Sequence, residues 1–147
     1  MGTTNLDDLE LSGALTVTGA LSADGGVSGD VTYTTVARTA TADGTGTGTI
    51  ADAGLLQFVT VTSASANNII VLPTPTPGTI VRLAVGANGF ELRSSAPATV
   101  AINGGTGASA ESAIAANSLV EVVCTSATSW QGWNIAATTL AAVEAAA

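Results

Sequence analysis

The sequence predicts an all-β protein: a β-sandwich or barrel-like C-terminal domain, preceded by an extended N-terminal β arm of hexad repeats. Three observations support this class. First, 46% of the residues are hydrophobic but only 3% are aromatic, and much of the apolar content is Ala and Val. Small and β-branched residues with many Gly are typical of strands and tight turns. Second, apolar and polar residues alternate with a period of two in several short segments. Third, turn signals recur roughly every ten residues.

Composition changes along the chain divide it into four segments, each of which we expect to be a structural unit. Residues 1–31 are the hexad-repeat arm, and residues 32–54 are a Gly/Thr-rich connection. Residues 55–136 are the β-sandwich domain, and residues 137–147 are an Ala-rich tail. The length of 147 residues suits one compact domain with an additional arm.

The arm contains the stretch Leu9–Gly26, which reads LELSGA, LTVTGA, LSADGG in three blocks of six residues. Apolar residues alternate inside each block, and a Gly at its fifth position then turns or kinks the chain. Three such short strands cannot form a core alone, and repeats of this kind bury their apolar stripe against neighbours. Either the neighbours are the arms of other subunits, or the arm is a meander on its own domain. Under the first interpretation the interface residues are Leu9, Leu11, Leu15, Val17 and Leu21.

The connection begins with TYTTVARTATA, which predicts a strand with Thr on its solvent face. The following DGTGTG is read as a flexible loop, and a calcium turn there is disfavoured because the motif occurs once and is incomplete.

Between residues 55 and 136 we expect six or seven short strands. Strands are predicted in LLQFVTVT, IIVL, TIVRLAV, FELRSS, APATVAI, LVEVVCTS and WQGWNIA. The Pro-rich segment 73–78 must interrupt the sheet, and GANG is expected to close a hairpin. ASAESAIAANS is ambiguous and could hold a short helical turn. The expected core consists of Leu56, Phe58, Val59, Val61, Ile70, Leu72, Ile80, Leu83, Val85, Phe90, Leu92, Val100, Ile102, Leu119, Val122 and Trp133.

Charge and missing residue types exclude several functions. The net charge is −8, there is no Lys, and the three cations are Arg38, Arg82 and Arg93. Nucleic acids and anionic membranes both require clustered cations, so neither is expected as a partner. No His is present to act as a general base or metal ligand, and no apolar run is long enough to span a bilayer. We therefore expect no enzyme activity, no cofactor and no metal, and a buried, inert thiol at Cys124.

Two further groups of residues are candidates for subunit contacts. Trp130 and Trp133 are three apart and therefore point to opposite faces of a regular strand. We place Trp133 in the core and Trp130 at an interface, where Trp is enriched. Glu91 and Arg93 share one strand face, and Arg82 on the adjacent strand is expected to join them in setting the register between subunits.

The passage from Ile69 to Trp133 resembles a β-domain common among virion proteins of tailed phages. The shared features are a strand ending in Leu-Pro, a Gly a few residues later, paired strands, an Ile-Asn-Gly turn, and a last strand that leads to Trp. The hexads are similar to the Leu/Val-x-Gly repeats of phage fibre shafts. The resemblance implies a homotrimeric structural protein on the outer capsid surface. Such a protein decorates the head and bridges neighbouring subunits of the major capsid protein. The alternative is a tail- or head-fibre domain that binds host-surface glycan.

Overall fold

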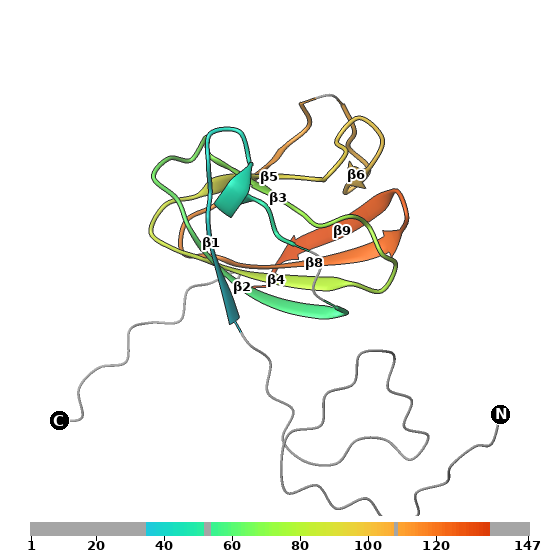
Figure 1. Ribbon diagram of the computed structural model, residues 1–147, viewed down its shortest axis with the longest axis horizontal. Coiled ribbons are helices and arrows are strands. Elements are labelled where there is room, and N and C mark those ends of the chain that lie inside the picture. The colour runs from blue at the N-terminus through green and yellow to red at the C-terminus, as the bar shows by residue number, and fades with distance from the viewer. Residues whose placement is uncertain (1–34, 52–53, 108, 136–147) are drawn as a thin grey trace, which may run out of the picture. The chain divides into compact units, whose positions relative to one another are not determined.

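The computed structural model describes residues 35–51, 54–107 and 109–135, and these form a β-sandwich (Figure 1). The predicted all-β class is confirmed. In chain order the elements are β1 (Thr35–Thr39), the short 3-10 helix η1 (Gly46–Gly48), β2 (Leu56–Thr62), β3 (Ile69–Val71), β4 (Ile80–Val85), β5 (Phe90–Arg93), β6 (Ala101–Ile102), β7 (Ser112–Ile114), β8 (Leu119–Ser126) and β9 (Ser129–Asn134). No helix among these residues is long and apolar enough to cross a membrane.

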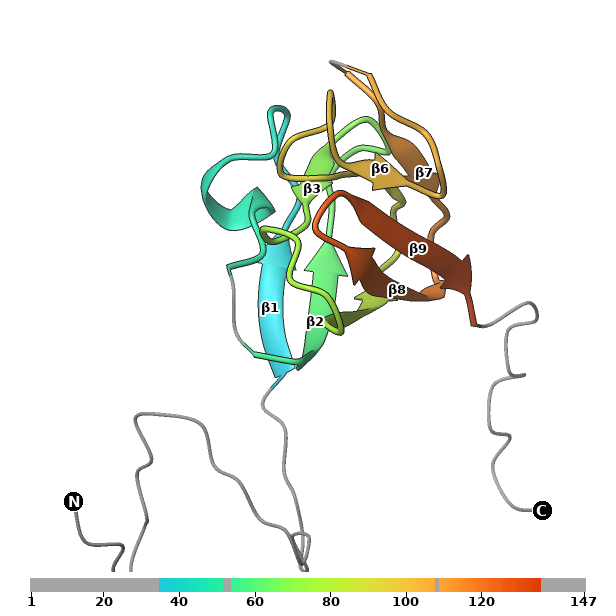
Figure 2. The same cartoon turned by 90° about the vertical axis from the view of Figure 1, so that its right-hand side faces the viewer.

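Two sheets form the sandwich. The larger sheet has six strands in the order β1-β2-β4-β8-β9-β6, and the smaller has three in the order β3-β5-β7. Figure 1 shows β3 and β5 above the larger sheet, and Figure 2 shows β1 beside β2 and the β8–β9 hairpin at the other side. The larger sheet is mixed, because β1, β2 and β4 run parallel while β8 is antiparallel to both β4 and β9.

The chain alternates between the sheets from β2 to β8, and this alternation explains the parallel pairs. Strand β3 lies between β2 and β4 in sequence but in the other sheet, and β5 then pairs in parallel with β3. The expected hairpin at GANG is therefore wrong. Strand β4 is already paired on both sides, by β2 and β8, so no edge remains for β5, and GANG carries the chain to the smaller sheet. The turn before WQGWNIA closes the β8–β9 hairpin.

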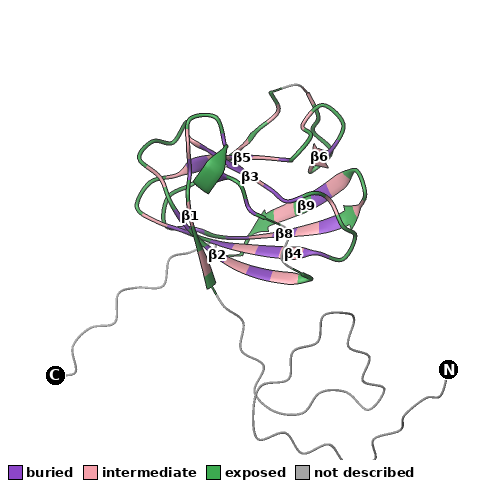
Figure 3. Ribbon diagram, viewed as in Figure 1, coloured by how far each residue is buried: buried purple, intermediate pink, exposed green. Residues whose placement is uncertain are grey.

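The core lies between the sheets and follows the alternation of each strand (Figure 3). Ten of the expected core residues are buried: Val59, Val61, Ile70, Leu72, Leu83, Val85, Phe90, Leu92, Val100 and Val122. The expectation is wrong for the half-buried Leu56, Phe58 and Ile80 and for the exposed Leu119 and Trp133. Ile102 is half-buried but packs against the core. Several buried apolar residues were not expected: Ala40, Ile50, Ile69, Val81, Val120 and Trp130. Cys124 is buried, as expected.

Most of these errors have one physical cause. A regular strand of a two-layer sandwich buries every second residue, so an apolar residue next to a buried one faces away from the core. Strand β3 is an exception, because Ile69 and Ile70 are both buried. In β2 the buried positions are Gln57, Val59 and Val61, which leaves Phe58 on the other face. In β9, Trp130 pairs with the buried Cys124 while Trp133 pairs with Glu121. Trp130 is therefore the buried indole and Trp133 the exposed one, the reverse of the burial we predicted.

The sandwich also includes segments that we read as connection or as ambiguous. Strand β1 and η1 lie between residues 35 and 51, and Ala40 and Ile50 are buried in the core. The sequence ASAESAIAANS contains β7, which pairs with β5, and no helical turn is found among its described residues. The Pro-rich segment links β3 to β4 as expected and ends in a tight turn. There the Thr79 N–H donates to the Thr76 carbonyl at 3.0 Å, and Gly78 supplies the positive φ of 91°.

Candidate functional site

The most unusual surface of the described residues is the side of the larger sheet that faces away from β3, β5 and β7. Here we name it the outer face. The register of β2, β4, β8 and β9 assigns it Leu56, Phe58, Thr60, Ile80, Arg82, Ala84, Leu119, Glu121, Val123, Gln131 and Trp133. In many sandwiches this side of a sheet is polar, because it meets water. In this chain it is mostly apolar.

One row of side chains crosses the outer face from β2 to β9. Phe58 aligns with Arg82, Arg82 with Glu121, and Glu121 with Trp133. The Arg82 Nε donates to the Glu121 carboxylate at 2.6 Å, and its guanidinium carbon lies 5.7 Å from the centre of the Phe58 ring. The row therefore places an ion pair between two aromatic residues, and a cation–π contact links the pair to one of them.

The exposed large apolar residues of this face lie on the β8–β9 side. Leu119, Trp133 and Ile135 are 37%, 50% and 45% exposed. The Ile135 N–H donates to the Leu119 carbonyl at 2.8 Å, so Ile135 continues the pairing of β8 with β9. Leu55 is the fourth large apolar residue that is exposed among the described residues, and it directly precedes β2. Successive residues of an extended chain point to opposite sides, so Leu55 and Leu56 do not share a face. Exposed apolar residues gathered in this way are typical of an interaction surface.

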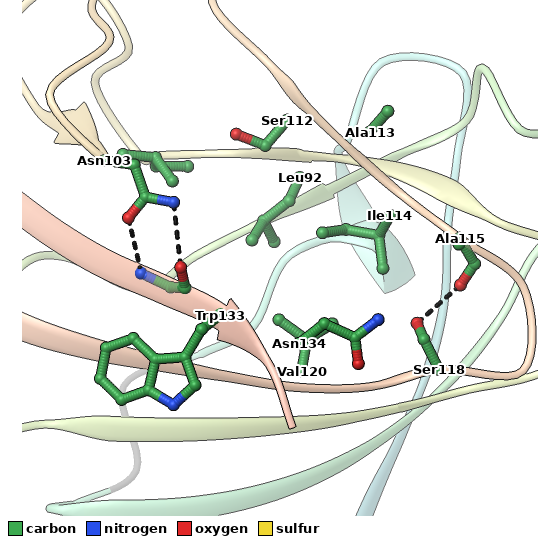
Figure 4. A pocket seen from close by; sticks show the side chains of 12 residues that line it. Leu92, Asn103, Ser112, Ala113, Ile114, Ala115, Ser118, Val120, Trp133 and Asn134 are labelled. Atoms are coloured by element: carbon green, nitrogen blue, oxygen red, sulfur yellow. Dashed lines mark hydrogen bonds between the residues drawn. The ribbon is translucent and has the colours of Figure 1, made fainter. Parts of the chain in front are cut away.

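A pocket of about 260 Å³ opens between the sheets near β9 and β7 (Figure 4). Leu92, Ile102, Ile114 and Val120 form its apolar part, and the figure shows the Trp133 ring projecting from β9 away from Leu92 and Ile114. Its polar groups are largely engaged: Ser118 Oγ donates to the Ala115 carbonyl at 2.7 Å, and the Asn103 amide bonds to the Gly132 backbone. No charged residue lines the pocket.

The residues that could carry chemistry are occupied or scattered. Within the described ranges, no three or more His, Cys, Asp or Glu lie close enough to hold a metal ion. Asp43, in the DGTGTG loop, accepts bonds from the Thr45 N–H, the Thr45 hydroxyl and the Thr41 hydroxyl. The pKa of Asp43 is lowered, first by the Thr45 N–H and then by the Thr45 hydroxyl. Burial raises the pKa of the Cys124 thiol, which donates to the Ser126 carbonyl.

The structure separates the interface residues that we predicted. Arg82 lies in the larger sheet and pairs with Glu121, whereas Arg93 lies in the smaller sheet and pairs with Glu111. Glu91 and Arg93 share the outward side of β5, as expected, but Arg82 does not join them. Trp130 is fully buried and cannot reach a partner, so its assignment to an interface is wrong. Leu9, Leu11, Leu15, Val17 and Leu21 lie outside the described residues.

Sequence reasoning missed Phe58, Trp133, Leu119 and Glu121 as members of one surface. The signal was present in β2: Val59 and Val61 alternate with the exposed Thr60 and Thr62, which assigns Phe58 to the same side as Thr60. The cross-strand neighbours could not be found, because they depend on the order of strands in the sheet. No protein-family model, curated protein or solved structure matches this chain.

Proposed function

We propose that this chain is a structural protein of a phage virion, a homotrimer that decorates and stabilises the capsid by bridging major-capsid subunits from outside. The resemblance of residues 69–133 to virion β-domains supports this role. The observation that carries it furthest is the apolar outer face, with Leu119, Trp133 and Ile135 exposed on the β8–β9 strands. Such a surface is stable in water only at some cost, and a protein that works inside a large assembly has neighbours to cover it.

Charge agrees with a role on the outside of a capsid. The described residues carry three Arg and four acids, Asp43, Glu91, Glu111 and Glu121, so the sandwich is nearly neutral. The remaining seven acids of the chain fall outside the described residues, and no cation accompanies them. A chain with this balance repels nucleic acid, which suits the outer surface better than the interior of a head.

The direct experiment is to add purified protein to phage heads assembled without it. The proposal expects saturable binding, with bound copies in multiples of three, and heads that resist heat or low salt better after binding. A Trp133→Ser variant is expected to bind fewer copies, and Leu55→Ser is the matched control because Leu55 is exposed but outside the outer face. Heads that take up no protein, or that gain no resistance, would contradict the proposal.

Deletion of residues 1–31 tests the arm separately. If the hexads contact other subunits, the shortened protein forms a weaker trimer or binds heads less tightly. A shortened trimer that binds heads with full affinity removes the arm from the proposal.

A second function, that of a fibre domain binding host-surface glycan, is favoured by one observation. Trp133 is half-exposed next to the Arg82–Glu121 pair, and sugars stack on aromatic rings while they bond to charged groups. This alternative expects the protein to bind host cells, with binding lost in Trp133→Ala and retained in Leu55→Ser. Absence of cell binding by the intact protein would dismiss it.

A further inference from the structure

We propose that the pocket between β7 and β9 is the docking site for residues 136–147 of the same chain, with the Leu140 side chain inside it. The occupant is a segment of this protein rather than a separate ligand. The inference goes beyond the proposed function, which gives the pocket no role.

The pocket exists because the smaller sheet is too narrow to cover the larger one. Six strands of the larger sheet face three of the smaller, and β7 is the last strand of the smaller sheet among the described residues. Figure 2 shows β7 above β9, and residues of both strands line the pocket. Strand β6, at the edge beyond β9, has two residues and leaves most of β9 uncovered. The core is therefore open at this side of the sandwich.

Gly132 leaves this opening unfilled. Trp130 is buried, and alternation along β9 points residue 132 to the same side. A Cβ at Gly132 would lie 3.3 Å from Cγ1 of the buried Val122, which agrees with an inward position. The space of about 260 Å³ exceeds the roughly 150 Å³ in which an apolar cavity binds benzene, so it accommodates a Leu side chain.

The lining of the pocket favours an apolar occupant. No charged residue lines it. Two of its polar side chains are already bonded within the protein, Asn103 to the Gly132 backbone and Ser118 to the Ala115 carbonyl. A site for a small molecule orients its ligand with placed polar groups. With these two groups engaged, an apolar side chain fits the pocket better than a polar ligand does.

The chain itself leaves the sandwich at the rim of the pocket. Asn134 lines the pocket, and the next residue, Ile135, is the last one that the structure describes. Residues 136–147 follow directly, so this segment is tethered to its docking site. A short tether gives an effective concentration of about a millimolar, so a contact that is weak between separate molecules is sufficient.

Leu140 is the residue of this segment that best suits the pocket. The segment reads AATTLAAVEAAA, in which Leu140 and Val143 are the large apolar residues and Glu144 is the one charged side chain. Leu140 comes five residues after Ile135, and five extended residues span up to about 17 Å. This length allows the chain to turn at the rim and return Leu140 to the pocket. Leu also gains more from burial than Val, because it has one more methylene group.

The experiment compares the thermal unfolding of the full chain with that of a chain shortened after Ile135. The shortened chain is expected to melt roughly 4–8 °C lower, the shift caused by losing one small stabilising contact in a domain of this size. Leu140→Ser in the full chain is expected to give most of the same decrease. Ala146→Ser, near the end of the segment, is the matched control and is expected to melt with the parent.

A second pair of variants tests the pocket. Ile114 pairs with the buried Phe90 and packs against the core, whereas Ala113 pairs with Glu91 and is exposed on the other side of β7. Shortening is expected to lower the melting temperature of Ala113→Ser as much as that of the parent, and that of Ile114→Ser by less. Each variant is compared with its own shortened form, so the cost of the substitution itself cancels. Amide hydrogen exchange of β7 should be about tenfold faster in the shortened chain.

Three results would overturn the inference. Equal melting and equal exchange of the full and shortened chains would show that residues 136–147 do not dock. A decrease on shortening that Leu140→Ser does not reproduce, or that persists in Ile114→Ser, would place the segment outside this pocket. A decrease that disappears on dilution would identify the segment of another copy as the occupant. If Ile114→Ser does not fold, the Leu140→Ser and exchange measurements decide.

Discussion

Asn103 and Gly132 are joined by two hydrogen bonds between a side-chain amide and a strand backbone. Asn103 Nδ2 donates to the Gly132 carbonyl at 3.0 Å, and the Gly132 N–H donates to Asn103 Oδ1 at 2.8 Å. The Asn103 N–H also donates to the Trp130 carbonyl. The amide thus extends the pairing of β6 with β9 beyond the two residues of β6 and holds the edge of the larger sheet in place.

Replacement of Asn103 by Gly is expected to lower the free energy of unfolding by about 1–2 kcal/mol. Two exposed hydrogen bonds are lost, and each contributes about 1 kcal/mol or less. Asn117 is the matched control, because it also has a positive φ, 55° against 49° for Asn103, and the structure gives its side chain no comparable bonds. Asn117→Gly is therefore expected to be neutral or slightly stabilising in urea unfolding. Equal effects of the two substitutions would show that the Asn103 amide contributes nothing.

Gly44 and Gly46 form a second matched pair, with φ values of 78° and 58°. A Cβ at Gly44 would lie 2.6 Å from Val71 Cγ2 and 2.9 Å from Ile69 Cγ2, whereas a Cβ at Gly46 meets nothing within 4 Å. Gly46→Ala is expected to cost about 1 kcal/mol from the backbone alone. Gly44→Ala must also push Ile69 and Val71 of β3 aside, so the melting temperature of this variant is expected to fall further. If Gly46→Ala proves the more harmful, this packing of the loop on β3 is wrong.

The two indoles should differ strongly in their effect on stability. Trp130 is fully buried, so Trp130→Ala is expected to cost about 3–5 kcal/mol. Trp130→Phe should cost less, because it keeps most of the ring and removes an Nε1 that has no hydrogen-bond partner among the described residues. Trp133→Ala, measured at low concentration, should change stability by less than about 1 kcal/mol. Chemical unfolding decides the order, and a reversed order would contradict the assignment of β9.

Cys124 provides a test of burial and of pH dependence. Its side chain is 1% exposed, so a thiol reagent is expected to react only as the protein unfolds. Burial raises the pKa of the thiol above its ordinary value of 9.0, so the folded state holds the proton more tightly. The resulting stabilisation is complete below pH 9 and is lost as the pH rises through the pKa of the folded state.

The comparison that isolates this effect is between the parent and Cys124→Ala. The difference in their free energies of unfolding should shrink as the pH rises above 9, because only the parent has the thiol. A difference that stays constant with pH, or immediate reaction of the folded protein with the reagent, would be inconsistent with a buried thiol.

Local sequence pattern was sufficient for most strands and for several turns. The alternation in TIVRLAV puts Val81, Leu83 and Val85 on one side of β4, and all three are buried, although our core list named Ile80 in place of Val81. Pro77-Gly78 lies in a tight turn, and Asn103-Gly104 closes a two-residue turn in which the Ile102 N–H and the Gly105 carbonyl bond to each other. These features depend on neighbouring residues alone, so they can be predicted without the fold.

The strand order and the outer face could not be predicted in this way. GANG has the composition of a hairpin turn, yet β4 has both edges occupied, which is a property of the whole sheet. Arg82 was grouped with Glu91 and Arg93 because their strands are adjacent in sequence, whereas its partner Glu121 comes from β8. The indoles of β9 could be separated by alternation, but which one is buried depends on the pairing of β8 with β9.

The most direct test of the account is the mass of the full chain in solution by light scattering. The account predicts a particle of about three times the chain mass of 14.2 kDa, because the proposed function is that of a homotrimer. A particle of one chain mass at every concentration would contradict it.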